Sequence, residues 1–281
     1  MRFKNLLIIS FIFFGCNDID DRQATERDLD IKINTSGNNI RDRILPPAEY
    51  HWVKEEPNSF GAFLQNIQLQ PDKSPILDYK GSPIPIQSEH IAILNYDVGT
   101  RDLQQCADAV IRLRAEYLFE RGKYSEIAFH FTSGDLFSWK QYSEGYRAVV
   151  SGNNVSFAKT KNEDDSYQNF RKYLDAVYNY AGTISLNKET ASIYNDENIK
   201  AGNIMVTPGS PGHALIIVGQ AINKNNESVY LLAEGYTPAQ SMHIITNAGT
   251  DINPWYKLSV KNDATITARY TFRPTNIRRF R

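Results

Sequence analysis

The chain has 281 residues, of which 31 are Lys or Arg and 32 are Asp or Glu, so its formal net charge is −1. A near-neutral chain without a basic tract offers no electrostatic surface to nucleic acid, and we expect no nucleic-acid partner. Its 16 Tyr, 14 Phe and 3 Trp residues suffice for a packed core, and its length suits one large domain or two small ones.

Residues 1–15 have the features of an export signal. Two basic residues precede an apolar run over residues 6–14, which is too short to span a membrane. The glycine before Cys16 makes this point resemble a bacterial lipoprotein cleavage site, with an ordinary signal peptide as the alternative. We therefore expect lipid on Cys16 to anchor the mature protein to a cell-envelope membrane, facing the periplasm or the cell surface.

The segment after this cysteine is predicted to be a flexible tether. Residues 16–45 are acidic at first and then rich in Asn, Gly and Ser. Frequent prolines over residues 46–90 favour short strands and turns instead of helices. One folded domain is therefore expected over residues 46–281, beginning with this proline-rich part.

A helix is predicted after an apolar strand at residues 91–96. Asp102 suits the N-cap, and Gln105 three residues later completes a capping-box pair. Cys106 is then the fourth helical residue, where the helix dipole favours a thiolate. Because the other cysteine lies in the export signal, this one has no disulfide partner. The alternative is a small buried apolar residue, since Cys106 also lies on the apolar stripe of the helix.

The rest of the chain reads as strands with one more helix. The predicted elements are strands at 127–131, 203–206, 213–218, 229–234 and 242–246, an aromatic segment at 138–147, a hairpin at 148–157 and a helix at 166–182. A helix packed on such an antiparallel β-meander makes the fold class α+β.

His213 begins the most apolar of these strands and follows a glycine that permits close approach. If Val218 faces Val229 in a hairpin, His213 lies directly opposite Glu234, on the same face of the sheet. Glu234 is thus a candidate to orient the imidazole, with Gln240 and His243 as alternatives. The competing interpretation is a polar residue and a charge at two strand ends.

The segments "QCADAVIRLRAEYL" (105–118) and "AGNIMVTPGSPGHALIIVG" (201–219) resemble the signature segments of the NlpC/P60 and CHAP group of papain-like amidohydrolases. The chain departs from them at Asn203, where aspartate is usual, and in the sequence around the cysteine. Its segment between cysteine and histidine is also long, as if residues 127–185 were an insertion. The chain also resembles a family of uncharacterised bacterial lipoproteins, through "DVGTRDLQQCADAV", "SPGHA" and "PWY".

The first resemblance implies a papain-like scaffold and acyl transfer. Cys106 would be the nucleophile, His213 the base and Glu234 the third member, acting on amide bonds of peptidoglycan stem peptides without a cofactor. Candidates to line a substrate groove are Arg101, Asp97, Trp139 and Tyr142, and the alternative is that they are ordinary surface and core residues.

Two other classes remain open from the residues. A non-catalytic lipid-anchored binding or structural module would bury the cysteine and stack ligands on aromatic residues such as Trp139, Tyr142, Tyr146, Trp255 and Tyr256. A metal site is the weaker alternative, because His130, His213, His243 and Cys106 show no zinc-type spacing. We therefore expect no metal.

Overall fold

The computed structural model describes residues 32–152 and 154–281. The predicted signal peptide, Cys16 and most of the predicted tether lie outside the described residues. The helices are α1 (Ile40–Arg43), α2 (Phe60–Gln65), α3 (Cys106–Glu120), α4 (Trp139–Ser143), α5 (Tyr167–Tyr178) and α6 (Thr183–Glu189). Among the described residues, no helix combines the length and the apolarity needed to cross a bilayer.

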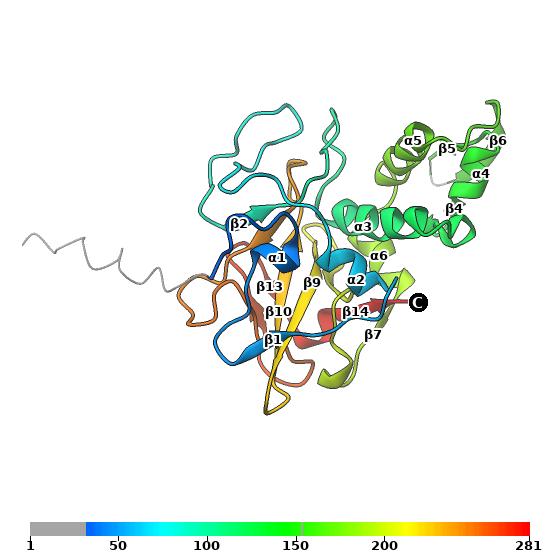
Figure 1. The fold of residues 1–281 in the computed structure, drawn as a ribbon. Helices are drawn as coiled ribbons and strands as arrows, with labels where there is room; N and C mark the ends of the chain where they lie inside the picture. The colour runs from blue at the N-terminus through cyan, green and yellow to red at the C-terminus, as the bar shows by residue number, and fades with distance from the viewer. Residues whose placement is uncertain (1–31, 153) are drawn as a thin grey trace, which may run out of the picture.

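One antiparallel sheet of eight strands organises the molecule, in the order β2-β11-β10-β9-β8-β14-β7, with β1 paired to β9 (Figure 1). Its strands are β1 (Tyr50–Trp52), β2 (His90–Ile93), β7 (Thr190–Ser192), β8 (Ile204–Thr207), β9 (His213–Asn223), β10 (Ser228–Glu234), β11 (His243–Ile245) and β14 (Ile277–Phe280). Three two-stranded pairs complete the fold: β3 (Ala128–His130) with β4 (Leu136–Ser138), β5 (Tyr146–Ser151) with β6 (Asn154–Lys159), and β12 (Thr265–Ile266) with β13 (Thr271–Phe272). The predicted α+β class with an antiparallel sheet is confirmed.

Residues 214–218 of strand β9 are buried on both faces of the sheet, which explains their unbroken apolar sequence. Ile216 and Val218 pack into the larger core beneath α3, whereas Leu215 and Ile217 pack into a second cluster with Met205 and Phe272. Side chains alternate along a strand, so His213 shares the face of Leu215. The start of β9 therefore carries its histidine on the side of the smaller cluster.

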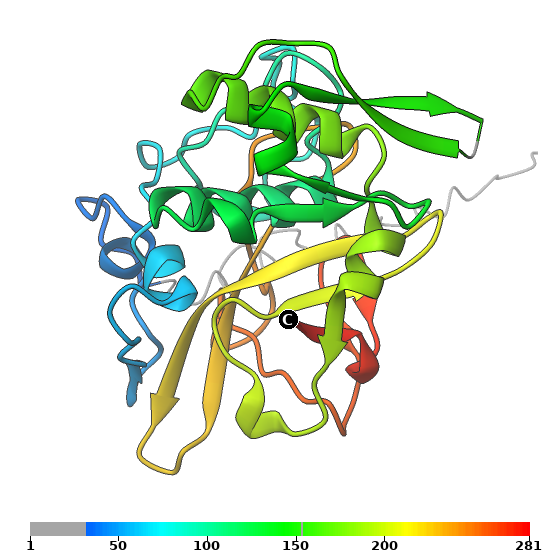
Figure 2. The same ribbon diagram turned by 90° about the vertical axis from the view of Figure 1, so that its right-hand side faces the viewer.

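Residues of the predicted insertion form a layer of their own. In both Figure 1 and Figure 2, α3 lies between the sheet and the group made by α4, α5, β5 and β6. Aromatic rings bind this group together, among them Phe137, Trp139, Tyr142, Phe170 and Tyr173. Trp139 is 2% exposed in this cluster and Tyr142 is also buried, so their predicted place in a substrate groove is wrong.

Several other predicted elements differ from the structure. The tether was expected to reach residue 45, yet Ile40 and Ile44 are fully buried, so the folded part begins earlier. The proline-rich segment includes the short helix α2, which Ser59 caps by accepting the Ala62 N–H. At the other end of the chain, β14 lies between β8 and β7 in the sheet, a strand that the pattern did not indicate.

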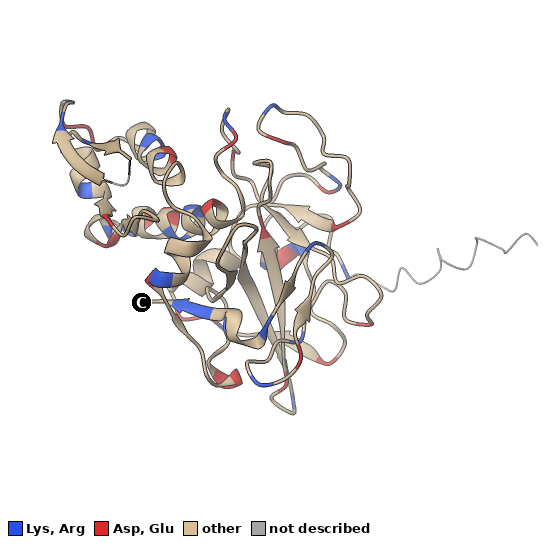
Figure 3. Ribbon diagram, turned by 180° about the vertical axis from the view of Figure 1, so that it is seen from behind, with Lys and Arg blue, Asp and Glu red and all other residues tan. Residues whose placement is uncertain are grey.

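Charged residues of both signs are interspersed over the ribbon (Figure 3). Among the described residues, His, Cys, Asp and Glu form no group of three or more suited to a metal ion.

Candidate functional site

Cys106 is the first residue of α3, three positions nearer its start than the capping pattern predicts. Gln105 is the N-cap, and the Oδ2 atom of Asp108 accepts its backbone N–H at 3.2 Å. Asp102 does not cap the helix. Its carboxylate instead accepts the Ala239 N–H at 2.7 Å and a hydrogen bond from the Gln105 side chain. The capping pair therefore lies three residues later than predicted, and the thiol is in the first turn of the helix, where backbone N–H groups have no helical partner.

Gly235 brings this helix start close to the sheet. A Cβ atom on Gly235, the residue after β10, would lie 2.9 Å from the Ala109 Cβ and 3.1 Å from the Gln105 carbonyl oxygen. Only a residue without a side chain allows the end of β10 to approach α3 so closely. This contact sets the distance between the helix that carries the cysteine and the strand that carries Glu234.

His213 and Glu234 form a buried pair. Nε2 of His213 lies 2.7 Å from Oε2 of Glu234, and the two residues are 3% and 2% exposed. The register differs from the predicted one: Val229 faces Ala221, and an irregularity between Leu231 and Leu232 places Ala233 opposite Ile216. Continued by one residue, this register makes the histidine and the glutamate diagonal neighbours on one face, still within reach of long side chains.

The two titratable groups shift each other's proton affinity. Burial lowers the pKa of His213, but hydrogen bonds with Cys106 and Glu234 outweigh burial and raise it to about 9. Burial likewise raises the pKa of Glu234, yet the hydrogen bond with His213 and the neighbouring ring of His243 lower it to about 2. At neutral pH the pair is therefore an imidazolium beside a carboxylate.

A cavity of about 560 Å³ brings Cys106 and His213 together. The residues around it come from the start of α3, the end of α5, the start of α6, the loop before β9, and the segment after β10. Gly212 permits the loop to pass α6, because a Cβ there would lie 2.5 Å from the Thr183 Oγ1. The rings of Tyr236 and Tyr270 each lie 5.2 Å from that of His213 and shield it from water.

Two polar groups of this cavity wall have no partner. The Oδ1 of Asp108 and the Oη of Tyr178 are buried without a hydrogen bond, although both residues line the cavity. Burial raises the pKa of Asp108 well above its ordinary value, which the Gln105 N–H only partly offsets. The sequence did not assign either group to the site, because Gln is not a preferred N-cap residue and the pair of Gln105 and Asp108 therefore gives no usual capping signal.

The other predicted groove residues are engaged in ion pairs outside this cavity. Asp97 pairs with Arg112 at 3.2 Å and with Arg171 at 3.2 Å, while Arg101 pairs with Asp175 at 2.8 Å. None of these residues lines the cavity of Cys106. Among the predicted orienting residues, Glu234 contacts His213 directly and His243 contacts Glu234 from the far side, whereas Gln240 has an unpaired side-chain nitrogen.

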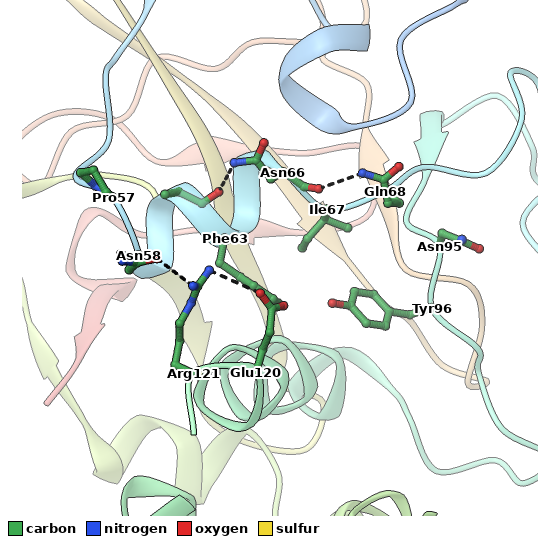
Figure 4. A pocket seen from close by; sticks show the side chains of 11 residues that line it. Pro57, Asn58, Phe63, Asn66, Ile67, Gln68, Asn95, Tyr96, Glu120 and Arg121 are labelled. Atoms are coloured by element: carbon green, nitrogen blue, oxygen red, sulfur yellow. Dashed lines mark hydrogen bonds and ion pairs between the residues drawn. The ribbon is translucent and has the colours of Figure 1, made fainter. Parts of the chain in front are cut away.

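A second cavity, of about 570 Å³, lies between α2 and the end of α3 (Figure 4). Amides and a phenol surround it, including Asn66, Gln68, Asn95 and Tyr96, with Glu120 and Arg121 at one side. It has no cysteine or histidine in its wall, so it offers neither a nucleophile nor a base comparable to those of the first cavity.

Comparisons with known proteins give one finding. The sequence profile of a family described as domain of unknown function 4846 matches residues 40–279. No curated protein and no solved structure matches the chain significantly.

Proposed function

This chain belongs to that family of unknown function, and we propose that it is a lipid-anchored cysteine hydrolase of the cell envelope. Its substrate class is the amide bonds of peptidoglycan stem peptides, cleaved on a papain-like scaffold. The observation that carries the proposal is the His213–Glu234 hydrogen bond of 2.7 Å, made in the cavity wall that also holds Cys106. A nucleophile, a base and a group that orients the base are the parts that this chemistry needs.

Each ring nitrogen of the histidine has a separate task in the proposed reaction. Nε2 is bonded to Glu234, which leaves Nδ1 for the thiol. In the resting thiolate–imidazolium pair the thiol proton already resides on Nδ1, and the thiolate sulfur of Cys106 attacks the amide carbon. The tetrahedral oxyanion accepts hydrogen bonds from free N–H groups at the start of α3. The C–N bond then breaks as the imidazolium protonates the departing amine, which leaves a thioester.

Water completes the cycle. His213 takes a proton from the water molecule that attacks the thioester, and the thiol leaves with that proton as the free acid forms. The raised pKa of His213, about 9, supports this role, because an imidazolium stabilises the thiolate at neutral pH. Deprotonation above that pH removes the charge, so we expect thiolate-specific reactivity to depend on this residue below about pH 9.

The proposed anchor places the enzyme beside its substrate. Lipid on Cys16 would hold the protein at a membrane of the envelope, where peptidoglycan is also found.

The test is alkylation of Cys106 by iodoacetamide across pH in the native protein. We expect rapid labelling near neutral pH and a loss of at least about tenfold in His213→Ala, the effect of removing a group that activates the thiol. His51→Ala is the matched control, because His51 lies exposed on β1. Stem peptides then serve as substrates, with Cys106→Ala as the inactive variant.

Labelling of Cys106 only after denaturation, unaffected by His213→Ala, would contradict the hydrolase. That result would favour the non-catalytic binding or structural module. Cleavage of stem peptides that persists in Cys106→Ala would contradict the assignment of the nucleophile.

A further inference from the structure

His243 poses a hydrogen-bonding problem in the centre of the protein. It is 0% exposed at the start of β11, and its Nδ1 lies 2.8 Å from the Ser241 carbonyl oxygen. A carbonyl oxygen only accepts, so Nδ1 carries a proton. The Nε2 atom is buried and has no hydrogen-bond partner. A buried polar atom left in this state costs free energy and calls for an explanation.

The nearest candidate partner for that nitrogen is Glu234. Its Oε1 lies 3.6 Å from Nε2 of His243, while its Oε2 is engaged by His213. A ring protonated on Nδ1 alone would turn the Nε2 lone pair toward a carboxylate oxygen, and both groups only accept. A second proton, on Nε2, converts this repulsion into a charge-assisted contact.

The sheet places Glu234 between the two histidines. His243 lies directly opposite Glu234 in the β10–β11 register, and His213 is its diagonal neighbour on β9. All three residues lie on the face of the smaller core cluster, with Leu232 and Ile245 as their apolar neighbours along the strands. The carboxylate therefore has one imidazole on each adjacent strand.

We propose that His243 is a positioning residue that carries a positive charge against Glu234, so that one carboxylate is shared between two imidazolium rings. The inference rests on the proposed function insofar as His213 is the base of that reaction. A shared carboxylate is held in place from both sides, and it attracts the His213 proton less strongly than an unshared one would. His243 thereby sets how readily the base can release its proton to the leaving amine.

Other charged and titratable groups near Glu234 also influence the protonation of the two histidines. The Nη1 of Arg269 lies 4.0 Å from Oε1 of Glu234, but its guanidinium is also paired with Glu89 and covers the ring of Tyr236. The ring of His90 lies 6.1 Å from that of His243, and both its nitrogens face carbonyl oxygens. The groups that any pH response must include are Arg269, Glu89, His90, Tyr236, Tyr256, His213 and Cys106.

The experiment follows the imidazole ¹⁵N signals of the ¹⁵N-labelled native protein by NMR. We expect both ring nitrogens of His243 to be protonated at neutral pH. In His243→Gln, which keeps an N–H donor but no charge, we expect the midpoint of His213 deprotonation to rise by about one pH unit, as when one neighbouring charge is removed. His90→Gln is the matched control, because His90 is half-buried nearby but does not contact Glu234, and we expect a smaller change.

Each outcome decides the inference. An unprotonated Nε2 of His243 at neutral pH would overturn it, as would a His213 midpoint that stays in place in His243→Gln. If that variant does not fold, the wild-type nitrogen signals still decide the charge. The proposed function fails separately, when alkylation of Cys106 is indifferent to His213→Ala, since the protonation of His243 is read without any reaction at Cys106.

Discussion

Helix α3 buries one ionisable side chain in its middle and another at its start, and the two differ in how many of their polar atoms have partners. Arg112 is 1% exposed, and its guanidinium reaches Glu116 at 2.6 Å, Gln104 at 2.8 Å and Asp97 at 3.2 Å. Asp108, one turn earlier, is 6% exposed and keeps one carboxylate oxygen unpaired. Arg112, with its set of partners, holds the layers together, whereas Asp108 lies incompletely partnered at the cavity of Cys106.

The paired charge also connects the two sides of α3. Glu116 accepts the Tyr167 hydroxyl of α5 at 2.8 Å, and Asp97 receives Arg171 of the same helix at 3.2 Å. The layer of residues 128–178 is thus joined to the rest of the fold through Arg112 and its partners. Substitutions in the middle of α3 should therefore affect the joining of the layers, and substitutions at its start should affect the cavity of Cys106.

The largest effect is expected from Arg112→Met. Removing the guanidinium leaves the buried Glu116 carboxylate without its positively charged partner, and a broken buried ion pair costs about 3–5 kcal/mol in the free energy of unfolding. Chemical denaturation measures this change. Arg101→Met is the control, because its pair with Asp175 is exposed and contributes about 1 kcal/mol or less. Equal losses in the two variants would refute the structural role assigned to Arg112.

A smaller effect is expected from Gly235→Ala. The new Cβ would lie 2.9 Å from the Ala109 Cβ, so α3 and β10 must separate, at a cost of about 1–3 kcal/mol. Slower alkylation of Cys106 should accompany this loss, since the thiol moves relative to His213. Gly182→Ala is the control, because Gly182 borders the same cavity but has open space for a Cβ and an extended φ of 177°. Unchanged alkylation in Gly235→Ala would show that this contact does not position the thiol.

The smallest effect, and the one that depends on pH, is expected from Asp108→Asn. Burial raises the pKa of Asp108, so the folded state holds a proton that the unfolded state has released above about pH 4. The free energy of unfolding of the wild type therefore falls as pH rises above that value. Asparagine binds no proton and keeps an acceptor for the Gln105 N–H, so the variant should be more stable by about 1 kcal/mol at neutral pH. Thermal denaturation at several pH values measures the difference.

That advantage should vanish at low pH, where the carboxyl of the wild type is protonated in both states. A variant that is less stable than the wild type at every pH would contradict this prediction. It would mean that the folded protein needs the ionised carboxylate of Asp108.

Local patterns were sufficient for the elements whose residues carry strong signals. The helix from Cys106, the hairpin of β5 and β6, and the strands β9 and β10 follow from apolar periodicity and from turn residues such as Gly152. The predicted contact between His213 and Glu234 was approximately correct although the predicted register was wrong. Near these residues the register differs from the predicted one by two residues, and a shift by an even number of residues keeps both side chains on the same face of the sheet.

Other features depend on partners that are distant in the chain. Asp102 is a good N-cap by its residue type, yet it bonds to Ala239, more than a hundred residues away. The sequence alone does not distinguish a buried Trp139 from an exposed stacking residue. Its burial depends on packing against Phe170 and Tyr173, which lie about thirty residues later in the chain. Short strands such as β14, with only four residues, have too little pattern to indicate a place between β8 and β7.

The sequence by itself determined that the chain has an antiparallel α+β fold, a helix near Cys106, and a histidine at the head of a buried strand, because these follow from periodicity and residue type over a few neighbouring positions. Tertiary structure alone decided that Cys106 and His213 share one cavity, that Asp97 and Arg101 form ion pairs outside it, and that Glu234 lies between two histidines. Those relations depend on distances across strands and layers, which are set by close approaches such as that of Gly235 to α3.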